Sequence, residues 1–130
     1  MKNKEKDIIK KGSSMLDKDI MPKVFDWNGL LYRLMGDEDL AKEIVDDFMK
    51  DIPNKLNALK EALNKGDALL IKKEAHMMKG ASGNIGAVAM QEIAEQIEIA
   101  GKAEDLVKAE LLTAKYEALL EIFKKNINRP

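Results

Sequence analysis

The sequence predicts an all-α protein, an antiparallel four-helix bundle with an additional short N-terminal helix. Apolar residues recur about every 3.6 residues over most of the chain, and no segment alternates as a half-buried strand does. The composition also favours helix, since Leu, Ile, Ala, Met, Glu and Lys are abundant and only three prolines occur. Glycine-containing turns separate the periodic segments, so successive helices should run antiparallel.

Two helices begin at aspartates in the first half of the chain. Asp26 can cap a short helix that Gly36 closes, and Asp37 can cap a long helix that Gly66 ends. Pro53 lies inside the long helix and removes a backbone donor, which predicts a kink or a break near position 51. The apolar face of the long helix consists of Leu40, Ile44, Phe48, Ile52, Leu56, Leu59 and Leu63.

The third helix carries the only histidine of the chain, His76. Asp67 can cap this helix, which is expected to run to about Gly83. Asn84 and Gly86 then supply the left-handed residues of its C-terminal cap.

The last two helices complete the bundle. One is expected over about residues 87–100, with Gly101 as its end, and the other over about residues 104–125. Their inward-facing residues are Met90, Ile93, Ala94 and Ile97 in the first, and Leu106, Leu112, Tyr116, Leu119 and Phe123 in the second.

Length and composition narrow the class of protein. Residues 1–18 alternate charge and include a Gly-Ser-Ser joint, which predicts a flexible tail or linker ahead of one bundle domain over residues 19–130. The net charge is −1 and no basic stripe alternates with aromatic residues, so no nucleic-acid partner is expected. No apolar stretch approaches the roughly 20 residues of a membrane span, so no membrane contact is expected. The absence of cysteine excludes disulfides and thiolate metal sites and fits a cytoplasmic protein.

On a helical wheel, the histidine lies outside the apolar stripe of its helix. That stripe consists of Ile71, Ala75, Met78, Ser82 and Ile85. Lysines, glycines and one leucine lie within about 60° of His76, namely Leu69, Lys72, Lys73, Lys79, Gly80 and Gly83. The imidazole is therefore expected on the outward surface.

These neighbours suit a nucleophile that meets a partner surface. Imidazole has a pKa near 6.5 and keeps a large neutral fraction at physiological pH. Lys79 can reach a phosphoryl group on the ring and attract it through a screened charge. Glycine costs roughly 0.8 to 1 kcal/mol in a helix interior, so Gly80 and Gly83 indicate a need for partner access. Close helix packing at Gly80 and a helix end at Gly83 are the simpler alternatives.

The segment after the histidine resembles a known signature. It reads His76-x-x-Lys79-Gly80-x-Ser82-x-Asn84-Ile85-Gly86-Ala87, and it is similar to the signature of the HPt domain, the histidine-containing phosphotransfer module of two-component phosphorelays. The resemblance extends over about residues 24–125.

This resemblance implies a function and partners. His76 would carry a phosphoryl group on its outward ring nitrogen, accept it from a receiver-domain aspartyl phosphate and pass it to another receiver. The family has no nucleotide site or cofactor of its own, so whether the chain counts as an enzyme stays open, and receivers supply the Mg²⁺. Many members are domains of hybrid sensor kinases, so the rest of such a kinase is a further candidate partner. A monomer is expected.

Other classes fit the residues less well. A haem or metal site would have to use an outward-facing His76 without a second histidine, and the Glu-x-x-His pair of di-iron bundles is absent because residue 73 is lysine. A kinase or ATPase would need a phosphate loop, but Gly80-x-x-Gly83 leads to no Gly-Lys-Ser/Thr. A non-catalytic helical adaptor, with His76 incidental, remains the alternative.

Overall fold

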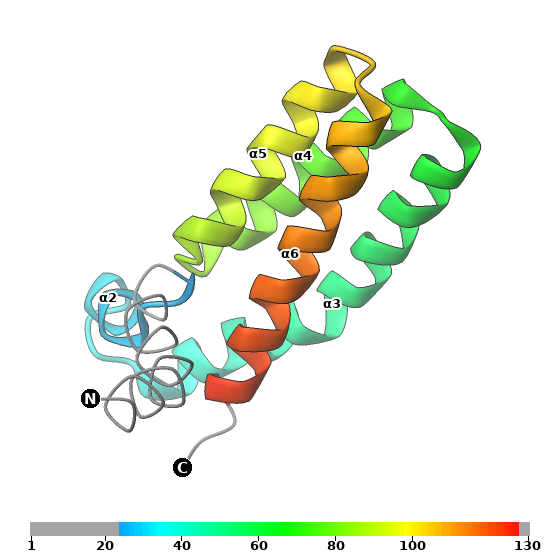
Figure 1. Cartoon of the computed structure of the whole chain (residues 1–130). Helices are drawn as coiled ribbons and strands as arrows, with labels where there is room; N and C mark the ends of the chain where they lie inside the picture. The colour runs from blue at the N-terminus through cyan, green and yellow to red at the C-terminus, as the bar shows by residue number, and fades with distance from the viewer. Residues whose placement is uncertain (1–23, 128–130) are drawn as a thin grey trace, which may run out of the picture.

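The computed structural model describes residues 24–127, which form five α-helices and, within that range, no β-strand. The helices are α2 (Trp27–Arg33), α3 (Glu38–Lys65), α4 (Ala68–Asn84), α5 (Val88–Lys102) and α6 (Leu106–Ile127). Figure 1 shows α3 to α6 as four long antiparallel helices, with α2 at the end of the bundle where α4 turns into α5. The predicted fold class, including the short additional helix, is confirmed. The tail expected over residues 1–18 lies outside the described residues.

Aspartate side chains begin the helices as the sequence predicts. The carboxylates of Asp26, Asp37 and Asp67 each accept a hydrogen bond from a backbone N–H three residues later, at 3.1, 3.0 and 3.1 Å. Each cap satisfies a donor that the first turn leaves without a partner and contributes about 1 kcal/mol. Gly66 ends α3 in the left-handed region, with a φ of 64°. These local signals make the turns short and fix the antiparallel order.

A kink or a break is predicted near position 51, and the break does not occur. α3 stays helical throughout, with Pro53 inside it. A proline in a helix interior costs roughly 3 kcal/mol. One core holds both halves of the helix and offsets this cost, through the buried residues Phe48, Ile52, Leu56 and Leu59.

Two helix ends also differ from the prediction. Asn84 is the last helical residue of α4, whereas Gly86 is left-handed with a φ of 79°. α5 continues through Gly101 by one residue, and the left-handed position after it is Glu104, with a φ of 60°. The left-handed turn therefore forms without a glycine, and Gly101 has another role.

Gly101 serves the packing of α5 on α4. It is buried, and a Cβ built on it would lie 3.0 Å from the backbone nitrogen of Lys72 and 3.1 Å from Cγ2 of Ile71. Side chains do not fit at such distances, so glycine lets the two backbones approach here. This close approach brings the outward residues of α4 and α5 within reach of each other.

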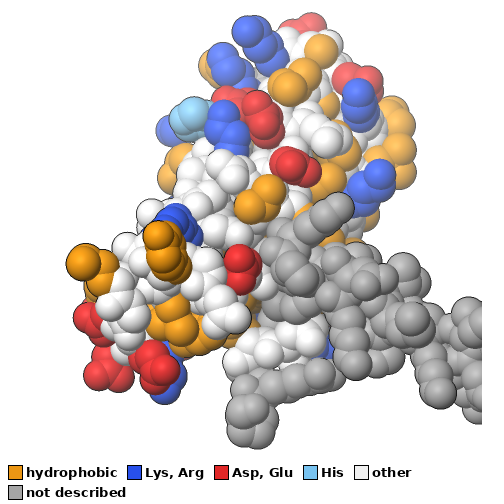
Figure 2. All heavy atoms as spheres, turned by 90° about the vertical axis from the view of Figure 1, so that its left-hand side faces the viewer, with side chains coloured by type: hydrophobic (Ala, Val, Ile, Leu, Met, Phe, Trp, Pro, Cys, Tyr) orange, Lys and Arg blue, Asp and Glu red, His pale blue; other side chains and the backbone are white. Residues whose placement is uncertain are grey.

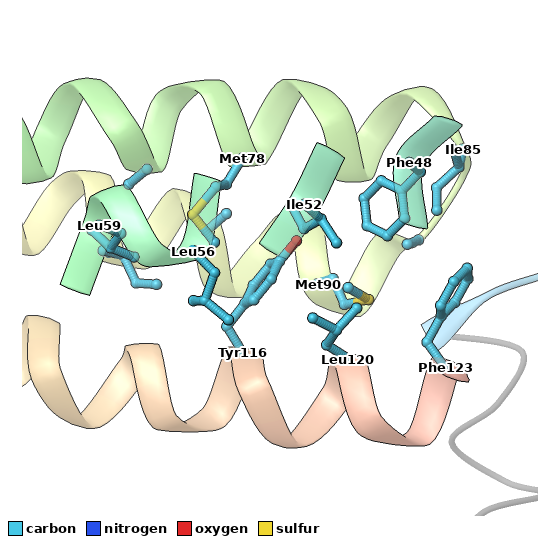
Figure 3. Packing of buried hydrophobic residues seen from close by; sticks show 14 of the residues in the cluster. Phe48, Ile52, Leu56, Leu59, Met78, Ile85, Met90, Tyr116, Leu120 and Phe123 are labelled. Carbon is cyan, nitrogen blue, oxygen red and sulfur yellow. The ribbon is translucent and has the colours of Figure 1, made fainter. Parts of the chain in front are cut away.

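The apolar faces of the four long helices meet in one core (Figure 3), and all five residues of the predicted stripe of α4 are buried. Tyr116 reaches from α6 into this core, where its hydroxyl lies 2.8 Å from the hydroxyl of Ser82. Leu40 and Leu106 were expected inward but are 39% and 37% exposed, because each lies in the first turns of its helix at an end of the bundle. None of the helices within residues 24–127 combines the length and apolar character that a membrane crossing needs.

Candidate functional site

The histidine lies near the middle of α4 and points out of the bundle. The side chain of His76 is 65% exposed, while its neighbours Ala75 and Met78 are fully buried. The predicted outward orientation is confirmed. A rigid, well-packed helix therefore presents this imidazole to the surroundings.

A carboxylate on α5 contacts both the histidine and the lysine one turn after it. The Nδ1 atom of His76 lies 2.8 Å from Oε2 of Glu98, and Nζ of Lys79 lies 2.8 Å from Oε1 of the same carboxylate. The side chain of Glu98 is 18% exposed and that of Lys79 is 28% exposed. One half-buried carboxylate thus fixes the positions of two more exposed groups.

The electrostatics of this cluster determine its protonation. The hydrogen bond from Lys79 is the main cause that holds the pKa of Glu98 below its usual 4.5, and the bond from His76 acts in the same direction against partial burial. The same bond to Glu98 raises the pKa of Lys79 above its usual 10.5. At neutral pH, Glu98 is therefore ionised and Lys79 is charged.

An ionised carboxylate only accepts hydrogen bonds, so Nδ1 of His76 must donate to Glu98. In the neutral ring, the lone pair then sits on Nε2, the ring nitrogen that does not contact Glu98. The arrangement presents a nucleophile whose tautomer and ring orientation are fixed by the carboxylate that accepts from its other nitrogen.

Sequence reasoning did not select Glu98 as a site residue. A usable signal was nonetheless present, because His76 and Glu98 lie equally far before and after Ala87 in the sequence. In an antiparallel helical hairpin, residues equidistant from the turn come opposite each other. Gly83 and Gln91 obey the same relation and are also in contact.

The two glycines singled out in the sequence have different surroundings. A Cβ on Gly80 would meet no atom within 4 Å, so this position is open. A Cβ on Gly83 would lie 2.6 Å from Nε2 of Gln91, so a flexible side chain of α5 covers this position. Lys79 and Gly80 lie beside His76, whereas Gly83 lies two turns further along the same face.

The acidic residues and the histidine of the described chain do not form a metal site. Across residues 24–127, no three side chains of the His, Cys, Asp or Glu types gather as a metal site would require. The charged cluster at His76 consists of one imidazole, one ammonium and one carboxylate, which is suited to holding and orienting an anionic group.

Comparisons with known proteins agree with this geometry. The model of the Hpt domain family matches residues 43–122, which include His76, Lys79 and Glu98. The structure is similar to the crystal structure of histidine-containing phosphotransfer protein B (HptB) from Pseudomonas aeruginosa PAO1, with a TM-score of 0.70 and 25% identity over 82% of this chain and 97% of that chain. No curated protein matches the sequence. Because the family model spans more than half of the chain, the chain belongs to the Hpt domain family, the histidine phosphotransfer modules of two-component phosphorelays.

Proposed function

We propose that His76 accepts a phosphoryl group from the aspartyl phosphate of one receiver domain and passes it to the aspartate of another. The Nε2 lone pair attacks phosphorus, and the N–P bond forms as the bond from phosphorus to the aspartyl oxygen breaks. The receiver carboxylate leaves with the electron pair. In the second transfer, the aspartate of the next receiver attacks phosphorus and neutral imidazole leaves.

One observation carries this proposal: His76 is 65% exposed while its Nδ1 is held by Glu98. Exposure gives a partner access to Nε2, and the bond at Nδ1 fixes which nitrogen carries the lone pair. After transfer the phosphorylated ring keeps its Nδ1 proton and is positively charged. The ionised Glu98 stabilises that charge and leaves the ring a good leaving group for the next step.

The neighbours of His76 have supporting roles in this proposal. Lys79 lies one turn from His76 with its ammonium group already oriented towards the same carboxylate, close enough to attract the phosphoryl oxygens. Gly80 leaves open space next to the imidazole for the partner backbone. Gly83 gives no such space, because the side chain of Gln91 covers it. Phosphoryl transfer depends mainly on such positioning and charge, so a rigid helix is a sufficient contribution from this side.

The test replaces His76 by glutamine and follows label transfer from phosphorylated receivers. The parent should acquire label that is labile in acid and stable in base, and His76→Gln should acquire none. The control is Met77→Gln, which places the same side chain on the next exposed position of α4. Thermal unfolding should change little for the histidine variant, because surface substitutions cost within about 0.5 kcal/mol. Labelling of His76→Gln, or its unfolding, would contradict the proposal.

A further inference from the structure

A surface hollow of about 380 Å³ lies between α2 and the turn from α4 to α5. Its lining combines apolar side chains (Leu30 and Val88), one acidic side chain (Asp26, whose carboxylate caps α2), polar side chains (Arg33 and Gln91) and the backbone of glycines that include Gly83. A hollow with this mixture of surfaces suits an apolar side chain that is flanked by a polar group.

This hollow and the histidine lie on the same face of α4. Gly83 lies seven residues after His76, which places it about 10 Å along the helix and about 20° away around it. Gly80, between them, carries no side chain and has no atom within 4 Å of a built Cβ. A standard interface covers about 800 Å² on each partner, a patch roughly 30 Å across. A single partner docked on His76 would therefore also cover the hollow.

Arg33 lies at the edge of this hollow. Its Nη2 atom lies 2.8 Å from the position that a Cβ on Gly86 would occupy, and Gly86 is left-handed with a φ of 79°. The guanidinium group therefore lies against the bare backbone of the α4–α5 turn. No carboxylate of residues 24–127 lies within 4.0 Å of it. Arg33 presents a positive charge beside the hollow.

Large apolar side chains are exposed around Arg33. Tyr32 is 87% exposed, Met35 is 95% exposed and Val88 is 47% exposed. Met35 also has a φ of 58°, a left-handed conformation that residues with a side chain rarely adopt. Arginine, tyrosine and methionine are the residue types enriched in protein interfaces. In Figure 2, the face that carries the pale-blue histidine also shows orange, blue and red side chains below it, with mostly white surface between.

We infer that Arg33 and the hollow form the second half of the docking surface for receiver domains and that Arg33 selects among receivers. A receiver that fits would place an apolar side chain in the hollow and a carboxylate next to the Arg33 guanidinium. Such a pair at the edge of an interface acts mainly on partner choice and on the rate of association. This inference rests on the proposed function, since it names the partner feature that the same site recognises.

The experiment measures phosphoryl transfer as a function of receiver concentration. The probe is the phosphorylated receiver that labels the parent fastest among the receivers of the source organism. Arg33→Glu should raise the receiver KM about tenfold and leave kcat nearly unchanged, and Arg33→Gln should raise KM less. The matched control is Lys108→Glu, the same charge reversal at an exposed site on α6 outside the hollow, which should leave KM at the parent value.

Raising the salt concentration should weaken transfer to the parent more than to Arg33→Gln, because only the parent makes the ion pair. Phosphoramidate, which needs no docking, shows whether each variant still presents a reactive histidine. Equal KM values for Arg33→Glu and Lys108→Glu would overturn the inference and leave the proposed function intact. If the parent accepts phosphoryl groups from no receiver, the proposed function fails and the inference fails with it.

Discussion

Replacing Gly101 by alanine tests whether the close approach of α4 and α5 depends on the side chain that is missing there. An added Cβ would lie 3.0 Å from the backbone nitrogen of Lys72 and 3.3 Å from the carbonyl oxygen of Ala68. Both are backbone atoms of α4, so no rotamer change relieves the contact and the helices must separate. Gly80 is the matched control, because it also lies inside a helix of this pair and a Cβ there meets nothing within 4 Å.

Gly80→Ala and Gly101→Ala both gain the higher helix propensity of alanine, but only Gly101→Ala introduces an overpacked contact. Alanine gains roughly 0.8 to 1 kcal/mol over glycine in a helix interior. At Gly80 this gain stands alone, so the free energy of unfolding should rise by nearly that amount. At Gly101, overpacking costs about 1 to 3 kcal/mol and outweighs the gain. Gly101→Ala should therefore be destabilised by about 1 kcal/mol, and the two variants should differ by about 2 kcal/mol.

Urea and thermal unfolding followed by circular dichroism measure this difference. For a domain of this size, 1 kcal/mol corresponds to about 4 to 8 °C in Tm, so the two variants should differ by roughly 10 °C. Glu98 lies one turn before Gly101 in α5, so the separation should also loosen its bond to His76 and slow phosphoryl transfer. If Gly101→Ala is as stable as Gly80→Ala, the helices do not depend on this contact and the argument is refuted.

Three further outcomes are expected. Lys79→Ala should slow transfer or shorten the phosphohistidine lifetime by no more than about tenfold, as for one screened charge, and complete loss of transfer in a folded variant would contradict this. Glu98→Gln should slow phosphoryl acceptance about tenfold, while Glu92→Gln, an exposed residue on the same helix α5, should match the parent; equal rates for both variants would contradict the role of Glu98. Burial raises the pKa of Tyr116 from 10.0 to about 12, so the stability that this residue contributes is complete below pH 10 and is lost as pH rises to 12. Urea titrations at several pH values should show this loss, on the order of 2 to 3 kcal/mol, in the parent and not in Tyr116→Phe.

The signals that predicted the helices correctly are local. A capping aspartate forms its hydrogen bond within one turn, and a 3.6-residue apolar stripe determines which face is buried, so Asp67 and the stripe of α4 were both predicted correctly. The possible break at Pro53 and the helix end at Gly101 were wrong, because the effects of both residues depend on neighbours that are distant in sequence. The buried residues of α3 before and after Pro53 keep that segment helical. Gly101 is needed inside α5 because the backbone of α4 leaves no room for a side chain there.

The residues of the candidate site also divide into those that local spacing predicts and those that depend on packing between helices. His76, Lys79 and Gly80 share one helix face, so spacing alone placed them together. Glu98 lies on the next helix, and its contact with His76 depends on the register between α4 and α5. The hollow beside Arg33 forms where α2, the end of α4 and the start of α5 lie together. The 3.6-residue pattern of apolar residues shows which face of each helix is buried, but it does not show which helix ends are neighbours.

The hairpin arrangement of α3 to α6 also has a kinetic consequence. Helices that are neighbours in sequence pack on each other through short turns, so most contacts join residues that are close along the chain. Domains with such local contacts fold within microseconds to milliseconds. The long-range step in folding is the packing of α3 on α6. These two helices are joined by the ion pair of Lys60 and Glu117 at 2.7 Å and by the edge-to-face pair of Phe48 and Phe123. Refolding should therefore be rapid and limited by the meeting of the first and last long helices.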